Sequence, residues 1–437
     1  QGCIMAPFLF NVYTNCLEAC LLNLEVDCPR VGVKSIPLLL YADDAVILAR
    51  TPFGLQKLID GYTDFMSSLG LMVNTSKSHF MILSRRIPKK NYSFFSNKTR
   101  LVQVTSFSYL GILFDNRIRW SQLRSLKQLQ LIKASGALRS FAKRLGGRPI
   151  KAMIELYRAK CISLALYGSA IWGYLEFNIL QIEENRFLRH LLSVPICTPA
   201  YLVHEELGFP YLEDLLALQP LKLWLSIWST PEKALSRAII EDCLALDNYH
   251  AIPWLDYVFK ELESLGAGSL FRSRGHYSKS DTQKLQNLFL ERKFLLREER
   301  ELMKPSVRNY VLLKSVKGIE PYLHWSNPKF MHTRLLVRLR FNLIIHQLST
   351  TKGWSDPKLL GPCDCDGQSI QSLSHFLFFC ANFKIPRSSY LVPILKDLGF
   401  SQWKPALFFL CLLPSPKICF GLGQFLSAAI RLRSSMH

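Results

Sequence analysis

The chain has 437 residues, 49% of them hydrophobic, which excludes wholesale disorder and allows two or three folded domains. Lys and Arg number 54 against 33 Asp and Glu, giving a net charge of +21. A charge of this size favours nucleic acid as the partner, with a membrane surface as the alternative.

Two apolar stretches are candidates for membrane spans, and neither has the pattern of one. Residues 161–175 are shorter than the roughly 20 residues that a spanning helix needs, and residues 405–430 are interrupted by Pro414, Pro416 and Lys417. The N-terminus has no signal-peptide pattern, and the twelve Cys show no regular spacing typical of secreted proteins. We therefore expect an intracellular protein. Because the chain opens with Gln1 and not Met, we also expect a fragment of something longer.

Residues 7–24 predict one helix, because apolar side chains recur at helical spacing and Pro7 suits a first helical position. Cys16 and Cys20 fall on the face expected to be buried. The strand-length apolar runs 38–41 and 45–49 then predict a buried hairpin, whose tip is Ala42-Asp43-Asp44.

A second amphipathic helix is predicted over 55–69, and Gly70 is placed to end it with a positive φ. A strand is expected at 80–83, and residues 101–115 have a β-like pattern. From Trp120 the pattern is mostly helical as far as about residue 347.

Basic side chains gather in residues 116–160, where twelve Lys and Arg stand against a single acid, Glu155. A solvated helical face is the plainer interpretation. At this density we favour a track for a phosphate backbone.

Asp43 and Asp44 are the most informative residues. Two adjacent carboxylates between apolar strands repel each other, and a divalent cation would remove that difficulty. Mg²⁺ prefers such hard oxygen ligands and is usually held by one or two carboxylates together with substrate phosphates. An exposed polar turn is the alternative.

Four segments, in order, resemble motifs of reverse transcriptases of the LINE-type, non-LTR retrotransposons. The Asp pair belongs to a Tyr-Ala-Asp-Asp box that is similar to the catalytic Tyr-x-Asp-Asp box of that family. The other segments resemble the loop before that box, the segment after it and the element near the primer grip: Gln1 to Asn11, Gly70 to Lys77 and Phe107 to Gly111. Two later segments, residues 165–173 and 205–208, also look like the region that follows the polymerase core.

The resemblance implies roles for individual residues. Asp43 and Asp44 would bind catalytic Mg²⁺, and Lys77 would act near the triphosphate as an acid for the leaving pyrophosphate. Template, primer or nucleotide would be contacted by Gln1, Gly2, Tyr41, Asn74, Tyr109 and Gly111. The partners implied are an RNA template, target DNA and dNTPs, with no membrane. The parent element would act as a ribonucleoprotein in nucleus and cytoplasm.

Departures from the family pattern affect the expected activity. The family places a further metal-binding Asp and the fingers upstream of the Gln-Gly loop. We therefore expect this chain alone to be inactive, although its parent would carry out two-metal nucleotidyl transfer. The alternative function is that of a non-catalytic remnant that binds RNA or DNA. A basic peripheral membrane protein has no motif in its favour.

Cys363, Cys365, His375 and Cys380 offer three thiols and an imidazole within eighteen residues, a set that suits a structural zinc site. Unpaired thiols beside a core His are the alternative. The cluster resembles the C-terminal Cys-Cys-His-Cys knuckle of the same family. In that family the region contacts nucleic acid, which makes Arg338 and Arg340 candidates for phosphate binding.

The predicted fold class is α+β. It comprises part of a right-hand polymerase palm, with helices packed on an antiparallel sheet, then a helical thumb, a helical linker and a small zinc knuckle. The expected boundaries are 1–115 for the palm, 116–210 for the thumb, 211–350 for the linker, 351–385 for the knuckle and 386–437 for an unassigned apolar tail.

Overall fold

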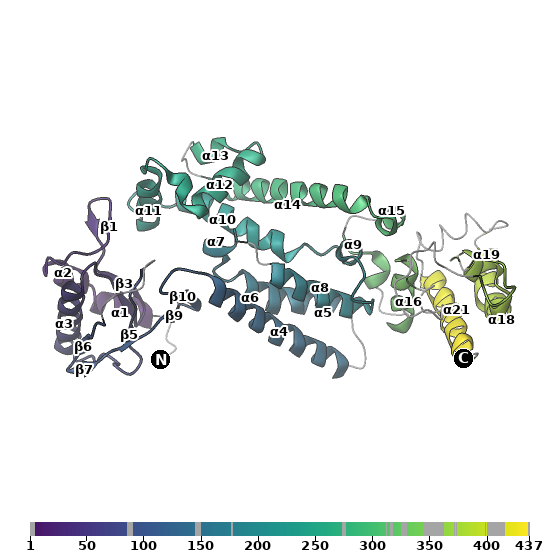
Figure 1. Cartoon of the computed structure of the whole chain (residues 1–437), viewed down its shortest axis with the longest axis horizontal. Helices are drawn as coiled ribbons and strands as arrows, with labels where there is room; N and C mark the ends of the chain where they lie inside the picture. Colours follow the sequence, from purple (N-terminus) through teal and green to yellow (C-terminus); the bar gives the residue numbers. More distant parts are fainter. Residues whose placement is uncertain are drawn as a thin grey trace. The chain divides into compact units, whose positions relative to one another are not determined.

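A computed structural model gives the architecture of the chain (Figure 1). The structure describes residues 5–84, 91–144, 150–175, 178–272, 277–311, 313–314, 318–324, 330–341, 343, 362–370, 372, 374–397, 399 and 416–435. Within that part of the chain, no helix is long and apolar enough to cross a membrane.

The chain folds into two compact units that interleave in sequence. The first unit joins Gln1–Leu126 to Leu221–Thr282, and the second joins Lys127–Pro220 to Gln283–His437. Mixed helices and small sheets agree with the predicted α+β class. The boundaries predicted near residues 115, 210 and 350 stay predictions.

The first unit begins with two short helices where the sequence predicted one. They are α1 (Ala6–Tyr13) and α2 (Leu17–Leu22). The predicted buried face is also wrong in part, because Phe8 is 61% exposed and Cys16 is exposed, whereas Leu17 is buried. Cys20 is half-buried. The apolar spacing therefore identified the helical conformation but not its continuity or its burial.

The helix α3 (Pro52–Ser68) matches its prediction closely. The Thr51 side chain accepts a hydrogen bond from the backbone N–H of Gly54, as an N-cap does, and Gly70 follows the helix at φ +73°. Leu58 of α3 packs with Leu17 and Leu21 of α2 in the core of this unit.

The predicted palm sheet is present only as separate two-stranded ladders among the described residues. Four ladders are antiparallel, and the β5–β8 ladder is parallel. The strands are β1 (Arg30–Val31), β2 (Lys34–Ser35), β3 (Leu38–Tyr41), β4 (Asp44–Ile47), β5 (His79–Phe80), β6 (Phe95–Ser96), β7 (Thr99–Arg100), β8 (Val102–Gln103), β9 (Ser106–Tyr109) and β10 (Ile112–Asp115).

The second sequence segment of the first unit is helical. It contains the C-terminal part of α10 (Leu212–Trp228), then α11 (Leu235–Leu244), η2 (Tyr249–Ala251), α12 (Pro253–Ser264) and α13 (Ser269–Arg272). Its core is aromatic, since Trp224 stacks on Phe271 with ring centroids 4.6 Å apart. The backbone N–H of Gly32, between β1 and β2, donates to the carboxylate of Asp242 in α11, which ties this segment to the rest of the unit.

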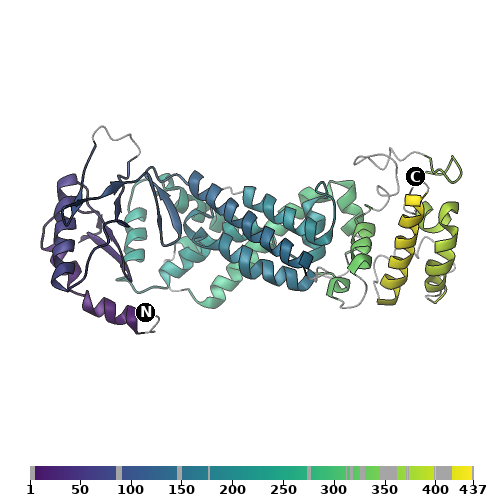
Figure 2. The same cartoon turned by 90° about the horizontal axis from the view of Figure 1, so that it is seen from below.

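The second unit is mostly helical, as predicted. In Figure 1 and Figure 2, α5 and α8 lie side by side, and their residues are in contact. Its described helices before residue 345 are α4 (Ser121–Arg144, which begins in the first unit), α5 (Ile150–Tyr157), η1 (Arg158–Ile162), α6 (Ser163–Leu166), α7 (Ser169–Trp172), α8 (Asn178–Leu192), α9 (Ala200–Leu207), the N-terminal part of α10, α14 (Lys279–Leu302, which begins in the first unit), α15 (Pro305–Val311), η3 (Pro321–His324) and α16 (Phe330–Arg340).

The C-terminal part of the second unit consists of short helical turns. They are η5 (His375–Phe379), η6 (Ala381–Phe383), α18 (Lys384–Pro386), η7 (Arg387–Leu391) and α19 (Val392–Asp397), followed by α21 (Pro416–Ser435). The helix α21 packs against both α16 and η7. The described part of the unassigned tail is therefore helical and belongs to this unit.

Candidate functional site

Asp43 and Asp44 lie at the tip of the β3–β4 hairpin. The turn consists of Ala42, at φ +52°, and Asp43, while Asp44 opens β4 opposite Tyr41. Both carboxylates are exposed, and Tyr41 is 63% exposed. The prediction of a buried hairpin is wrong as to its burial, since all side chains of β3 and β4 are half-buried or exposed. Both carboxylates are consequently open to solvent.

The two carboxylates act on different neighbours. Burial raises the pKa of Tyr62 in α3, and the charge of Asp43 raises it further. Burial likewise raises the pKa of Tyr109 in β9, and there the charge of Asp44 adds to the effect. The charge of the Asp pair therefore affects one tyrosine of α3 and one tyrosine of the β9–β10 hairpin.

The Tyr-Leu-Gly element forms the tip of the β9–β10 hairpin. Tyr109 pairs with Ile112, and the two residues between them have positive φ, +48° at Leu110 and +75° at Gly111. Two consecutive positive φ values are typical of the tight hairpin turn that Gly favours. Tyr109 is thereby held at the end of a strand, at a distance over which it senses Asp44.

Asn74 organises the turn that carries Lys77. Its side-chain Oδ1 accepts hydrogen bonds from the Ser76 hydroxyl at 2.7 Å and from the Lys77 backbone N–H at 3.2 Å. Its carbonyl oxygen accepts from the backbone N–H of Ser78 at 3.1 Å. An Asn that binds the backbone ahead of it is a common turn-former. Lys77 itself is exposed, and Gln1 and Gly2 lie outside the described residues.

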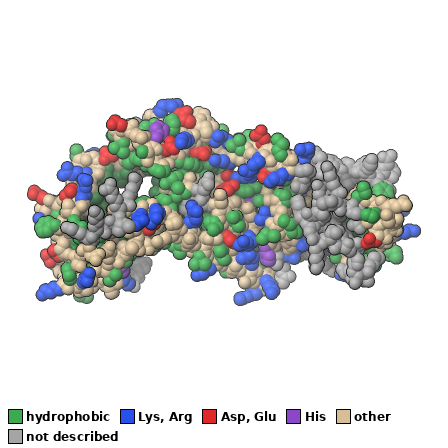
Figure 3. All heavy atoms as spheres, in the orientation of Figure 1, with side chains coloured by type: hydrophobic (Ala, Val, Ile, Leu, Met, Phe, Trp, Pro, Cys, Tyr) green, Lys and Arg blue, Asp and Glu red, His purple; other side chains and the backbone are tan. Residues whose placement is uncertain are grey.

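The basic segment 116–160 is divided between surface and core. In the second unit Lys133, Lys143 and Arg144 are exposed on α4, whereas Lys127 is only 3% exposed. The Lys127 ammonium donates to the carbonyl of Leu164 at 2.9 Å, and burial lowers its pKa. Lys127 is therefore not part of a phosphate track. On the face drawn in Figure 3, Lys and Arg side chains lie interspersed with apolar and acidic ones.

Arg338 and Arg340 of α16 are engaged inside the second unit. Arg340 is 2% exposed, and its Nε lies 2.8 Å from Oε1 of Glu206. Arg338 is half-buried and donates from Nε, at 2.9 Å, to the carbonyl of Ser193 at the end of α8. The assignment of Arg340 to phosphate binding is contradicted by this burial, and Arg338 has only part of its side chain at the surface.

Cys363, Cys365, His375 and Cys380 come together in space. Their potential ligand atoms all lie within 4.8 Å of one another. The sulfurs of Cys363 and Cys380 are 3.6 Å apart, and the sulfur of Cys365 is 3.3 Å from Nε2 of His375. With Zn–S bonds of about 2.3 Å, two sulfurs of a tetrahedral site stand about 3.8 Å apart. The donor set and its spacing therefore fit zinc.

The backbone around the cluster is shaped by tight turns. Gly367 has φ +66°, and Asp366 accepts hydrogen bonds from the backbone N–H groups of Gln368 and Ser369. Burial raises the pKa of the Cys380 thiol to about 12, so proton loss from this residue requires a nearby positive charge. Sequence reasoning missed Arg387, whose buried guanidinium donates to three carbonyls of the His375–Cys380 segment.

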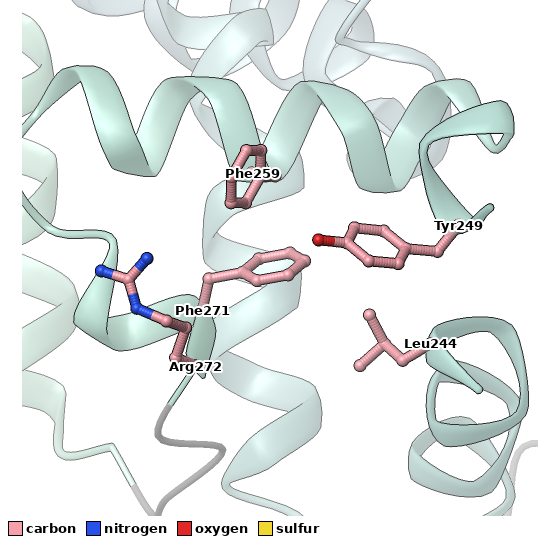
Figure 4. Close-up of a pocket in the computed structure, with 5 residues that line it drawn as sticks. All are labelled: Leu244, Tyr249, Phe259, Phe271 and Arg272. Carbon is pink, nitrogen blue, oxygen red and sulfur yellow. The ribbon is translucent and has the colours of Figure 1, made fainter. Parts of the chain in front are cut away.

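A pocket of about 330 Å³ lies among the helices of residues 235–272 (Figure 4). Its lining is mostly apolar, with Leu244, Tyr249, Phe259 and Phe271 around it and Arg272 at one side. The Arg272 guanidinium is paired with Glu263 at 2.7 Å. The lining has no nucleophile and no group with ligand spacing for a metal, and we do not include it in the functional site.

Comparisons with known proteins agree with the motifs. Residues 1–114 match the family described as reverse transcriptase (RNA-dependent DNA polymerase). The chain is also 27% identical, over 234 residues, to the "Retrovirus-related Pol polyprotein from type-2 retrotransposable element R2DM" of Drosophila melanogaster. That match covers 48% of this chain and 20% of the relative, so it spans about a fifth of the relative's length. The predicted relationship to reverse transcriptases of non-LTR elements is confirmed.

Proposed function

We propose that this relative of the non-LTR retrotransposon reverse transcriptases carries the metal-binding carboxylate pair of an RNA-directed DNA polymerase. One observation carries the proposal: Asp43 and Asp44 stand exposed at the tip of a β-hairpin, inside the segment that matches the reverse transcriptase family. Reverse transcriptases use Mg²⁺, whose preferred ligands are carboxylate oxygens. When bound, the metal would stabilise the charge that develops on the transferring phosphoryl group.

The neighbouring residues are assigned to substrate positioning. Tyr109 and Gly111, at the tip of β9–β10, would place the primer terminus, which is consistent with the field of Asp44 reaching Tyr109. Lys77 would meet the triphosphate, and its exposure and its fixed turn at Asn74 support this role. Tyr41 is exposed beside the Asp pair and would contact the incoming nucleotide.

Nucleic acid is the proposed partner, as RNA template and as DNA. The exposed basic residues of α4 and of the segment after it support this assignment, together with the net charge of +21. Lys133, Lys143 and Arg144 lie on α4, and Lys151 and Lys160 follow.

The Cys/His cluster is proposed to bind one structural zinc ion. The short distances between the four side chains support this, because three thiols and an imidazole would gather at such spacing to complete a closed tetrahedral site. Bound zinc would also supply the positive charge that a buried thiol needs to lose its proton.

The polymerase proposal is tested by primer extension on an RNA template with Mg²⁺ and dNTPs. Asp43→Asn and Asp44→Asn are compared with Asp64→Asn, an exposed acid of α3, in the complete open reading frame that encodes this chain. We expect either hairpin variant to lose more than about 100-fold in rate, because loss of one electrostatic stabiliser typically costs 100- to 1000-fold. Unchanged DNA synthesis by both variants would refute the proposal.

Binding titrations at several salt concentrations, made beside primer extension on the same proteins, distinguish the second candidate function. Nucleic-acid binding with a steep salt dependence, but with no DNA synthesis in any variant, would identify a binding protein without catalysis.

A further inference from the structure

His375 and Cys380, two of the four proposed zinc ligands, depend on an unusual backbone turn. They are five residues apart, and in an α-helix, at about 100° per residue, their side chains would diverge by about 140°. The segment His375–Phe379 is instead a π-helical turn, closed by a hydrogen bond of 2.7 Å from the Cys380 N–H to the His375 carbonyl. A π-turn has more residues per turn than an α-helix, which reduces this divergence, and the potential ligand atoms of His375 and Cys380 lie within 4.8 Å of each other.

The last carbonyls of this turn are held by a single side chain. Arg387 donates from Nε to the Leu377 carbonyl at 2.8 Å and from Nη2 to the Cys380 carbonyl at 2.6 Å, with Phe376 at 3.4 Å. The carbonyls at a helix end have no partners inside the helix, and a planar guanidinium can bind several of them at once. Arg387, which lies seven residues after Cys380 in the sequence, therefore fixes the C-terminal end of the turn.

The charge of Arg387 points to the same cluster. The residue is only 8% exposed, and among the residues that the structure describes its guanidinium donates to three backbone carbonyls and to no carboxylate. A buried cation without a counter-charge is costly. Three thiolates and one Zn²⁺ carry a net charge of −3 + 2 = −1, so the occupied cluster would supply the missing negative charge next to Arg387.

We propose that Arg387 is a positioning residue of the Cys/His metal site. It holds the π-turn that aligns His375 with Cys380, and its buried charge is balanced by the occupied site. This inference rests on the proposed zinc site, and it is independent of the proposed polymerase activity.

The test measures zinc affinity of the full chain by competition with a chelator, and Co²⁺ absorption as a report on ligand geometry. Arg387→Met is compared with Lys384→Met, an exposed cation three residues away, and with Cys380→Ser. We expect Arg387→Met to lose about 10- to 100-fold in zinc affinity, as partners of metal ligands typically do when replaced, and to lose intensity in the thiolate–Co²⁺ band. Lys384→Met should keep both properties, and Cys380→Ser should lose the band.

A second variant, Arg387→Lys, tests whether Arg387 positions the turn or only stabilises the fold. It also replaces Arg387→Met in the test if that variant does not fold. It keeps the charge but loses the planar group that reaches several carbonyls, so its affinity should lie between wild type and Arg387→Met. Equal zinc affinity and equal Co²⁺ spectra in wild type and the Arg387 variants would overturn the inference. A wild-type chain without stoichiometric zinc would overturn it as well, while leaving the proposal for Asp43 and Asp44 standing.

Discussion

Arg340 and Glu206, 134 residues apart in the chain, form an ion pair whose two side chains are completely buried, with Nε and Oε1 2.8 Å apart. The Arg340 guanidinium also lies 3.3 Å from Glu320, and the Tyr310 hydroxyl donates to Glu206 at 2.5 Å. The Tyr322 hydroxyl donates to Glu206 too. This network joins the Glu-Glu-Leu-Gly segment at the end of α9 to α15, η3 and α16 within the second unit.

The first prediction concerns this network. Arg340→Leu should lower the free energy of unfolding by about 3–5 kcal/mol, because it leaves the buried carboxylate of Glu206 without its cation, whereas Glu320 keeps Lys314 at 3.3 Å. Chemical denaturation of the purified chain measures the change. Lys133→Leu is the control, since Lys133 is exposed on α4 and its replacement should cost about 0.5 kcal/mol or less. A similar cost for both variants would mean that the ion pair contributes nothing specific.

Arg340 also illustrates what sequence could not predict. Its chemistry and its place in a basic helix suggested phosphate binding, but the residue that decides its role, Glu206, is distant in sequence. The same limit applies to α1, where apolar spacing indicated a helix, and yet Phe8 and Leu9 are exposed. Burial depends on contacts between distant segments, and periodicity within one segment does not specify them.

Local patterns were the more reliable guides. The α3 helix and Gly70 after it follow from apolar periodicity and φ preferences that act within a few residues. The Cys/His cluster was also predicted from sequence, because three thiols and an imidazole close together in the chain are a typical ligand set for structural zinc.

The second prediction concerns the pH dependence of stability. Glu184 of α8 is buried, and its burial raises its pKa to about 8, even though the backbone N–H of Leu212 donates to it. The folded protein therefore holds this proton more tightly than the unfolded chain. The stabilisation is complete below about pH 4.5 and is lost as the pH rises to about 8, with a slope of up to about 1.4 kcal/mol per pH unit.

Glu184→Gln should remove this loss, because an amide stays neutral at every pH and can still accept from Leu212. We expect the variant and the wild type to melt at similar temperatures near pH 5, and the variant to melt higher near pH 9. Burial lowers the pKa of His204 to about 3, so this residue makes the folded protein less stable as the pH falls below about 6.5. The two proteins are therefore also compared above pH 6.5, where His204 is neutral in both the folded and the unfolded state. An equal decline of both proteins between pH 6.5 and pH 8 would contradict the assignment to Glu184.

The third prediction uses two lysines of one helix to locate the nucleic-acid interface. Lys133 is exposed on α4, whereas Lys127 is buried, with its ammonium over the rings of Tyr167 and Trp172 at 5.4 and 6.0 Å. An exposed lysine that contacts a phosphate displaces a counterion, so Lys133→Met should reduce the slope of log affinity against log salt by about 0.9 for duplex DNA. Lys127→Met should leave that slope unchanged, because its charge never reaches the phosphates. Binding titrations at several salt concentrations measure both slopes. Equal slopes for wild type and Lys133→Met would exclude this position on α4 from the track, whereas a reduced slope for Lys127→Met would mean that α4 rearranges when nucleic acid binds.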